Sequence, residues 1–357
     1  MNLNQTVNQA GSDRATEAVP RTGGATSVVP GEAVLTVSDL RVTFTGGGRT
    51  VHAVTGLSYQ LQKGRTLAII GESGSGKSVS ARALMGLLPP SAQVSGSARI
   101  GDDELIGLPD REMRKLRGTD VAMVFQDPAR SLNPTMKIGL QIIEAVRAHQ
   151  KMERQQAVER GIELLRLVRL PAPERRFHEY PHQLSGGMRQ RVMIAIALAA
   201  DPQVLIADEA TSALDVTTQA QIMELLLDLQ ERLGMAVVLI SHDIGLAASY
   251  ADDVLVMYAG RAVEFGPTEM LFGNVQMPYT QALLGSVPQL TTPPHTLLPV
   301  IPGQPPDLRA LPQGCPFRPR CASATEQCAN TPELTEHQPG HWWACWHPIG
   351  DSDGGTK

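Results

Sequence analysis

No apolar segment of this sequence is long enough to span a membrane. The longest unbroken apolar run is the nine residues from Val192 to Ala200, whereas a membrane-spanning helix needs about 20. Residues 1–33 lack the apolar core of a secretory signal peptide, so we expect no signal peptide. The formal net charge of −5 argues against a nucleic-acid-binding surface, and no nucleic-acid partner is expected. These absences favour a soluble chain that would attach to a membrane only through a partner.

Cysteine and tryptophan are missing from the first 314 residues. All four cysteines and all three tryptophans follow residue 314, and residues 287–357 contain 13 of the 26 prolines. Such a proline density cannot continue a domain of regular helices and strands, so we expect a domain boundary near residue 287. At the other end, residues 1–33 are rich in Asn, Gln, Thr, Gly and Ser, which predicts a disordered tail.

The segment Gly71–Ser78 matches the phosphate-loop pattern G-x-x-x-x-G-K-[ST] at every fixed position. An apolar run at residues 66–70 predicts a strand before it, and residues 78–88 predict a helix that two prolines end. Between strand and helix, backbone N–H groups can surround an anion, and the helix dipole adds positive potential. In this pattern Lys77 reaches the β- and γ-phosphates and the Ser78 hydroxyl coordinates Mg²⁺. The segment therefore predicts a nucleotide phosphate site.

Strands alternate with helices through most of the chain before residue 286. Runs of apolar or alternating residues predict strands, and apolar residues at helical spacing predict helices. We expect strands at residues 35–44, 51–61, 120–125, 204–207, 235–240, 254–258 and 261–265, and helices within 141–170, up to residue 200 and from Asp215 to residue 233. This alternation predicts an α/β fold with a largely parallel sheet, helices on both faces and active residues at the C-terminal ends of strands.

Two adjacent carboxylates, Asp208 and Glu209, directly follow the predicted buried strand at 204–207. One carboxylate at such a strand end can hold Mg²⁺, directly or through water, and the second can orient and activate water beside the γ-phosphate. Two acids at a strand end are also typical of a solvated loop. The phosphate loop earlier in the chain favours the catalytic interpretation.

The segment Leu184–Arg191, LSGGMRQR, closely resembles the signature sequence of ABC-type ATPases. A serine hydroxyl and two glycine amides at a helix start form an anion site. The order of motifs is also similar to that of an ABC ATPase, over residues 34 to about 285. It runs through the phosphate loop, Gln126, the signature, Asp208-Glu209, the stretch ending at Asp215, and His242.

The resemblance implies a fold of three parts at residues 34–286. They are a RecA-like, mostly parallel sheet core, a helical subdomain at about 127–200 and an antiparallel β subdomain. It also implies that Glu209 polarises the attacking water and that His242 contacts the γ-phosphate. Phosphate-binding residues implied by it are Ser73, Gly74, Ser75, Gly76, Lys77 and Ser78.

The remaining implied roles concern magnesium, adenine and a partner subunit. The Mg²⁺ residues are Ser78, Gln126 and Asp208. Phe44 would stack on adenine, although a core aromatic is nearly as compatible with its spacing. In this family the signature of one subunit completes the ATP site of another, so Ser185, Gly186 and Gly187 would contact ATP bound to the partner.

Three further stretches resemble the ATPase subunits of dipeptide, oligopeptide and nickel importers. They lie at residues 126–134, 278–284 and 302–321. Members of this branch work as two homologous ATPases beneath two membrane permeases, supplied by an extracytoplasmic binding protein. The resemblance therefore implies an ATP-hydrolysing subunit at the cytoplasmic face of the membrane. Short peptides are the expected cargo, with nickel chelates or other small solutes as the alternative.

Four cysteines lie in the proline-rich extension, with 5, 6 and 16 residues between Cys315, Cys321, Cys328 and Cys345. Disulfides are disfavoured in a cytosolic chain. A four-cysteine zinc site usually contains C-x₂₋₄-C pairs, and a 4Fe–4S cluster usually has a local C-x₂-C run. Neither pattern occurs here, and unligated buried thiols are a further alternative. The spacing alone therefore does not choose a ligand.

A bound group that orders the extension is favoured, because a proline-rich tail with little periodic apolar pattern needs a staple. Similar tails in the peptide-importer branch carry a 4Fe–4S cluster, so the resemblance implies one here in a structural role, with zinc as the alternative. The three tryptophans would shield the cluster or pack the tail. His341 and His347 are rival ligands, although histidines near a cluster more often lie beside it or on the surface.

Two other kinds of function compete with import. One is a soluble ABC ATPase of translation or DNA repair, but such proteins usually have two cassettes in one chain or long coiled-coil insertions, and neither is visible here. The other is an ATPase-like subunit of a multi-subunit enzyme without transport. Co-purification with membrane permeases would distinguish them.

Overall fold

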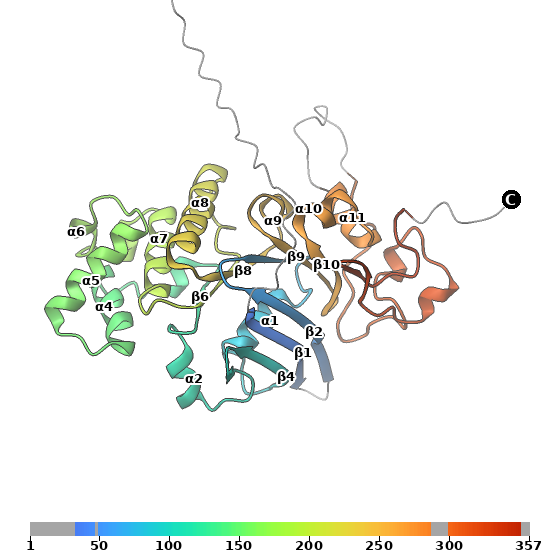
Figure 1. Ribbon diagram of the computed structural model, residues 1–357, viewed down its shortest axis with the longest axis horizontal. Helices are drawn as coiled ribbons and strands as arrows, with labels where there is room; N and C mark the ends of the chain where they lie inside the picture. The colour runs from blue at the N-terminus through green and yellow to red at the C-terminus, as the bar shows by residue number, and fades with distance from the viewer. Residues whose placement is uncertain (1–32, 47–48, 287–298, 351–357) are drawn as a thin grey trace, which may run out of the picture. The chain divides into compact units, whose positions relative to one another are not determined.

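The computed structural model describes residues 33–46, 49–286 and 299–350. Nearly all of the predicted tail at residues 1–33, and the start of the proline-rich extension, lie outside the described residues. Figure 1 shows the described chain coloured from blue to red along its length. The compact unit that contains both the predicted ATPase and the extension spans Glu32–Lys357.

Among the described residues, the larger sheet has eight strands in the order β11-β12-β10-β9-β3-β8-β7-β6. The five strands from β9 to β6 are parallel, and β10, β12 and β11 add antiparallel pairs. The strands are β3 (Thr66–Ile70), β6 (Val121–Val124), β7 (Val204–Asp208), β8 (Ala236–Ser241), β9 (Asp253–Tyr258), β10 (Arg261–Pro267), β11 (Thr335–Gln338) and β12 (His341–Trp343). The predicted largely parallel sheet is confirmed.

Alternate residues of the central strands enter different cores, because successive side chains point to opposite faces of a sheet. In β3, Leu67 and Ile69 join one hydrophobic core together with helix α1 (Lys77–Leu84), whereas Ala68 and Ile70 join another with helix α9 (Ile244–Tyr250). Strands buried on both faces read as continuous apolar runs. This burial explains why these strands could be found in the sequence.

A second, antiparallel sheet lies beside the first and has the order β2-β1-β4-β5 in the described chain. Strands β1 and β2 are the predicted pair, and both are longer than the runs that predicted them. The strands are β1 (Ala33–Gly46), β2 (Arg49–Gln62), β4 (Ala92–Ile100) and β5 (Asp103–Glu104). Their inward-facing side chains share the core of α1 and the Leu67 face of β3.

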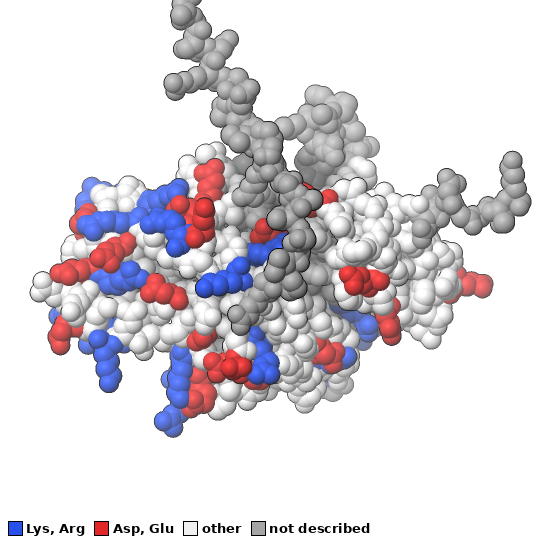
Figure 2. All heavy atoms as spheres, in the orientation of Figure 1, with Lys and Arg blue, Asp and Glu red and all other residues white. Residues whose placement is uncertain are grey.

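The helices between β6 and β7 form a group of their own, shown in green in Figure 1. Helices α4, α5 and α7 contact one another, and α7 also contacts α8 and β6. The α-helices in the described part of the chain are α1, α2 (Asp110–Leu116), α3 (Pro128–Ser131), α4 (Ile138–His149), α5 (Arg154–Leu167), α6 (Pro173–Arg176), α7 (Gly186–Ala197), α8 (Val216–Leu233), α9, α10 (Thr268–Gly273) and α11 (Pro278–Gly285). On the face shown in Figure 2, basic and acidic side chains intermingle over this group.

Helix α1 is shorter than predicted. It ends at Leu84 rather than at Leu88, because Gly86 takes a left-handed φ of 60°. The Leu87 N–H donates to the Arg82 carbonyl at 2.9 Å and the Gly86 N–H donates to the Ala83 carbonyl at 3.0 Å. These two bonds form a Schellman motif, which closes a helix without any proline.

The C-terminal extension adds strands to the main sheet. Strand β12 pairs antiparallel with β10, and β11 continues the sheet beyond it. Behind this junction the fully buried Glu264 accepts hydrogen bonds from the Gln276 N–H at 2.8 Å and the Met277 N–H at 3.3 Å, and pairs with His341 Nε2 at 3.0 Å. Buried polar groups are stable when they are paired in this way. The extension is thereby held against the ATPase fold.

Candidate functional site

The segment Gly71–Ser78 connects β3 to α1 and packs closely on neighbouring backbone. Gly71, Gly74 and Gly76 have φ values of 148°, 81° and 103°. A Cβ on Gly71 would lie 2.2 Å from the Met257 carbonyl oxygen, and one on Gly76 would lie 2.5 Å from the Ala53 carbonyl oxygen. Glycine is therefore required at Gly71 and Gly76 for both conformation and space, and at Gly74 for conformation alone.

Lys77 is buried at the start of α1, with 4% of its surface exposed. Its Nζ donates to the carbonyl oxygens of Gly71 at 2.7 Å and Glu72 at 3.0 Å. Burial lowers the pKa of Lys77, and the carboxylates of Glu209 and Asp208 oppose that effect. The ammonium therefore lies across the loop, where an anion bound by the loop would receive its charge.

Ser78 and Asp208 meet at the end of β7. The Ser78 hydroxyl donates to Asp208 Oδ1 at 2.6 Å, and Arg82 lies 4.0 Å from the other carboxylate oxygen. Burial raises the pKa of Asp208, while the Ser78 hydrogen bond lowers it. Together with Gln126 these residues offer hard oxygen donors of the kind that Mg²⁺ prefers.

The described residues contain no cluster of three or more His, Cys, Asp or Glu side chains that could hold a metal ion. Mg²⁺ is usually bound by one or two carboxylates together with substrate phosphates. The site around Ser78 and Asp208 fits that mode, in which the nucleotide supplies part of the coordination.

Glu209 lies between two polar side chains. Its Oε2 accepts a hydrogen bond from Gln126 Nε2 at 2.8 Å, and its Oε1 is 3.5 Å from His242 Nδ1. Its backbone has a left-handed φ of 47°, and its N–H donates to the Ile240 carbonyl at 3.0 Å. Non-glycine residues rarely adopt this conformation, and it is typical of strained functional positions. The carboxylate is thus held in a fixed orientation.

The structure brings most of the predicted site residues together. The phosphate loop, Gln126, Asp208-Glu209 and His242 follow β3, β6, β7 and β8, which are neighbours in the sheet. Because these strands are parallel, their C-terminal ends lie along one edge, where ligands of open α/β sheets bind. This edge can hold a nucleoside triphosphate and the water molecule that hydrolyses it.

The signature residues belong to a different neighbourhood. Ser185 caps α7 and accepts a hydrogen bond from the Met188 N–H at 3.3 Å. Gly187 packs against α8, where a Cβ would lie 2.5 Å from Thr218 Cγ2. Gly186 begins the helix beside Leu214. Helix α7 contacts α3, α4, α5, α8 and β6, whereas α1 contacts β1, β2 and β7. The prediction that Ser185, Gly186 and Gly187 act on a partner's nucleotide is consistent with this separation.

Phe44 lies near the end of β1, half-buried against the core of the antiparallel sheet. Its backbone pairs with Val51, and Val51 lines a pocket next to the phosphate loop. The predicted stacking of Phe44 on adenine stays a prediction.

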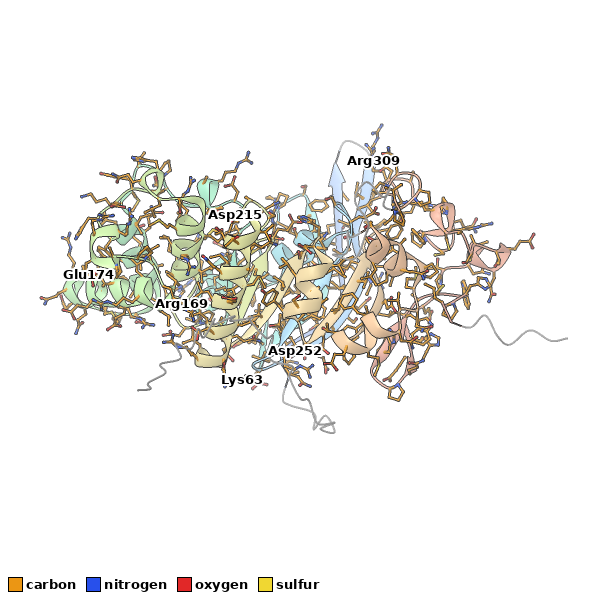
Figure 3. All side chains as sticks on the ribbon, turned by 90° about the horizontal axis from the view of Figure 1, so that it is seen from above. Lys63, Arg169, Glu174, Asp215, Asp252 and Arg309 are labelled. Atoms are coloured by element: carbon orange, nitrogen blue, oxygen red, sulfur yellow. The ribbon has the colours of Figure 1, made fainter. Side chains whose placement is uncertain are left out.

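Sequence reasoning missed the approach of the C-terminal extension to this site. A pocket of about 350 Å³ is bounded on one side by Ser73, Gly74 and Ser75 and on the other by residues 305–309 of the extension. Figure 3 shows Arg309 next to the blue strands, and Arg309 lines a second hollow with Thr50 of β2. Only the resemblance of residues 302–306 to importer ATPases drew attention to this segment, and that resemblance says nothing of its position.

The four cysteines of the extension line one small pocket together with Met277 and Trp346. The Cys315 N–H donates to the Cys328 carbonyl at 2.9 Å, which ties two of them together. Burial raises the pKa of Cys315 and Cys321, and it raises that of Cys345 to about 11. Negative charge on the neighbouring thiols adds to the rise at each of these three. These shifts favour the neutral, protonated form of the three thiols.

None of the helices in the described parts of the chain has the length and apolar character needed to cross a bilayer.

Two sequence families match this chain. The family described as ABC transporter matches residues 54–212, and the family described as the C-terminal region of oligopeptide/dipeptide transporters matches residues 263–328. The second match begins in β10 and ends at Cys328. The two matches therefore include both the phosphate loop and three of the four cysteines.

Curated relatives are similar over nearly their whole length. The chain is 48% identical to the oligopeptide transport ATP-binding protein OppD of Escherichia coli K12, over 89% of this chain and 94% of that protein. It is 49% identical to the dipeptide transport ATP-binding protein DppD of Bacillus subtilis 168, over 88% of this chain and 95% of that protein.

Solved structures of ATP-binding cassettes share the fold. A dimeric structure of the cassette MJ0796 bound to ADP and Pi has a TM-score of 0.59 at 29% identity, covering 66% of this chain and 98% of that one. The structure of cbiO1 from Clostridium perfringens, part of the cbiONQ ABC transporter complex, has a TM-score of 0.57 at 28% identity, covering 68% and 91%.

Proposed function

This chain belongs to the ATP-binding subunits of the oligopeptide and dipeptide ABC transporters, and we propose that it hydrolyses ATP to drive the import of peptides. The observation that carries the proposal is the similarity through both the ATPase part and the C-terminal region. A soluble ABC ATPase of translation or repair would account for the first match but not for the second. The ABC-type ATPase fold expected from the sequence is confirmed by the solved cassettes.

Different residues of this chain bind the phosphates, activate the attacking water and offer ligands to Mg²⁺. Lys77 and the loop amides bind the phosphates and offset their negative charge. Glu209, oriented by Gln126 and His242, accepts a proton from the attacking water. Ser78, Gln126 and Asp208 would hold Mg²⁺, which would supply positive charge to the phosphates of the nucleotide.

We propose that the functional unit contains two homologous ATPase subunits. Ser185 and the two glycines at the start of α7 present a helix N-terminus to a nucleotide bound elsewhere. The dimeric cassette among the similar structures supports such an arrangement. The two ATPases would lie on the cytoplasmic face of the membrane, beneath two permeases supplied by an extracytoplasmic binding protein.

Reconstitution tests this function. The chain would be co-expressed with the two permeases and second ATPase from its own gene neighbourhood, purified as a complex and placed in proteoliposomes with the binding protein. We expect uptake of a labelled tri- or tetrapeptide that requires ATP. Uptake of a nickel chelate but not of peptides would overturn the substrate class, and failure to co-purify with any permease would overturn the import function.

We also propose that Cys315, Cys321, Cys328 and Cys345 hold a 4Fe–4S cluster. The donor set fits, since all four thiols line one pocket and such a cluster takes four thiolates. A single zinc ion bound by the same four thiolates is the alternative. The role we propose is structural.

Anaerobic purification checks the cluster. We expect about four irons per chain and the visible absorbance of an iron–sulfur protein, both lost in Cys321→Ser. Ser323→Ala changes another residue of the same pocket and should keep the iron. A colourless wild-type protein with one zinc would contradict the proposal.

A further inference from the structure

Arg320, which lies in the extension between two of the cysteines, reaches the phosphate loop. Its two terminal nitrogens donate to the two carboxylate oxygens of Glu72, at 2.6 and 2.9 Å. Its Nε donates to the Pro302 carbonyl at 2.8 Å, and one terminal nitrogen also contacts the Tyr258 hydroxyl at 3.2 Å. The Arg320 side chain is only 5% exposed. Such a two-pronged pair combines strength with a fixed orientation.

Glu72 is the second residue of the phosphate loop, and its N–H, its carbonyl and its carboxylate all form hydrogen bonds. Its N–H donates to the Tyr279 hydroxyl at 2.8 Å, and its carbonyl accepts from Lys77 Nζ at 3.0 Å and from the Ser75 N–H at 3.2 Å. Arg320 therefore holds the side chain of a residue whose backbone contacts the phosphate-binding lysine. A shift of Glu72 would displace Lys77 and the amides around it.

The position of Arg320 depends on the short turn that carries it. A 3₁₀ turn at Arg318–Arg320 lies between Cys315 and Cys321. Before the turn, Phe317 is buried and packs edge-on against Tyr258 and Tyr279, with ring centroids 5.3 and 5.4 Å apart. The same few residues thus supply a wall of the cysteine pocket and the cation that holds the loop.

We propose that Arg320 is a positioning residue for the phosphate loop, and that through Glu72 it carries the state of the cysteine-lined pocket to the ATP site. The first half rests on this chain's own contacts. The second half rests on the proposed cluster. Cys315 and Cys321 flank the turn at Arg318–Arg320, so a ligand bound to both cysteines fixes both ends of the turn. When that ligand is lost, the turn can move, and Arg320 no longer fixes Glu72 of the phosphate loop. ATP affinity then falls although no residue that touches ATP has changed.

The test measures binding of a fluorescent ATP analogue to the isolated full-length chain. Arg320→Gln should weaken binding roughly tenfold, the size of a typical coupling between sites. Arg111→Gln removes the same charge from an exposed position of α2, away from the cysteine pocket, and should leave binding unchanged. Equal affinity in the two variants would overturn the proposal.

A double-mutant cycle separates positioning from a general loss of stability. If Arg320 acts through Glu72, then Arg320→Gln combined with Glu72→Gln should weaken binding little more than either change alone. Amide exchange at Gly71–Ser78 should also rise in Arg320→Gln while exchange in the buried strand β7 stays constant. Additive effects, or faster exchange throughout the chain, would show that Arg320 only stabilises the fold.

A separate variant tests the link between Arg320 and the cysteine pocket. Cys321→Ser should weaken binding of the analogue about as much as Arg320→Gln, and the two changes should not add. Unchanged binding in Cys321→Ser, from a wild type that contains iron, would overturn the link. The iron content of the same samples distinguishes the test of the cluster from the test of Arg320. A wild-type protein without metal refutes the cluster. The Arg320–Glu72 double-mutant cycle then tests the positioning role by itself. Neither readout depends on peptide transport.

Discussion

Glu209→Gln lowers ATP turnover of the assembled transporter by about 10²–10⁴-fold, the usual contribution of positioned acid–base assistance. Glutamine keeps the size of the side chain and one oxygen that can accept from Gln126, but it cannot take a proton from water. ATP binding should therefore stay close to that of the wild type. Steady-state phosphate release and equilibrium binding of ATP, measured on the same preparation, check both halves.

The matched control is Glu224→Gln, the same chemical change at an exposed position of α8. It should leave turnover unchanged. Hydrolysis in Glu209→Gln within a factor of a few of wild type would refute Glu209 as the base. A large loss of ATP affinity would show instead that the carboxylate holds the loop together, through its contacts with Gln126 and His242.

Lys77→Ala weakens ATP binding itself, by about 10- to 100-fold. Charge-assisted hydrogen bonds are worth about 1.5–3 kcal/mol each, and 1.4 kcal/mol corresponds to a factor of ten in affinity. The change also removes the hydrogen bonds from Lys77 Nζ to the carbonyls of Gly71 and Glu72, which link the two ends of the loop. Titration with a fluorescent ATP analogue measures the effect.

Lys63→Ala serves as the control, since Lys63 is an exposed lysine in the turn before β3. We expect no loss of affinity there. Lys77→Arg should be intermediate, because it keeps the charge but places a larger, planar group in a closely packed loop. Wild-type affinity in Lys77→Ala would contradict the assignment of this loop as the phosphate site.

The two predictions distinguish binding from chemistry at one edge of the sheet. Lys77 acts on the nucleotide before and during the reaction, so its loss raises the dissociation constant. Glu209 acts on the water in the transition state, so its loss lowers turnover. Arg320 contacts Glu72 of the same loop as Lys77, so its loss should also raise the dissociation constant, by an amount at the lower end of the range expected for Lys77→Ala.

Local sequence signals predicted much of the main sheet. Strands such as β3 and β7 are buried on both faces, and their apolar runs stand out from the polar loops around them. The glycines of the phosphate loop and the caps Asp215 and Gly234 of α8 are also local features, because backbone conformation depends on a few neighbouring residues. The length of α1 was wrong for a local reason as well: Gly86 stops the helix before the prolines do.

The sequence by itself determined the chemistry of the phosphate loop, the carboxylate pair and the family to which the chain belongs. Only the tertiary structure decided which distant residues contact the phosphate loop and hold it in place. Arg320 and Glu72 are separated by 248 residues, β12 joins the sheet through β10, and the four cysteines gather in one pocket. Contacts of this kind leave no periodic pattern, because each depends on the shape and charge of a surface formed by distant parts of the chain. The loop is a local motif, but its support comes from the other end of the protein.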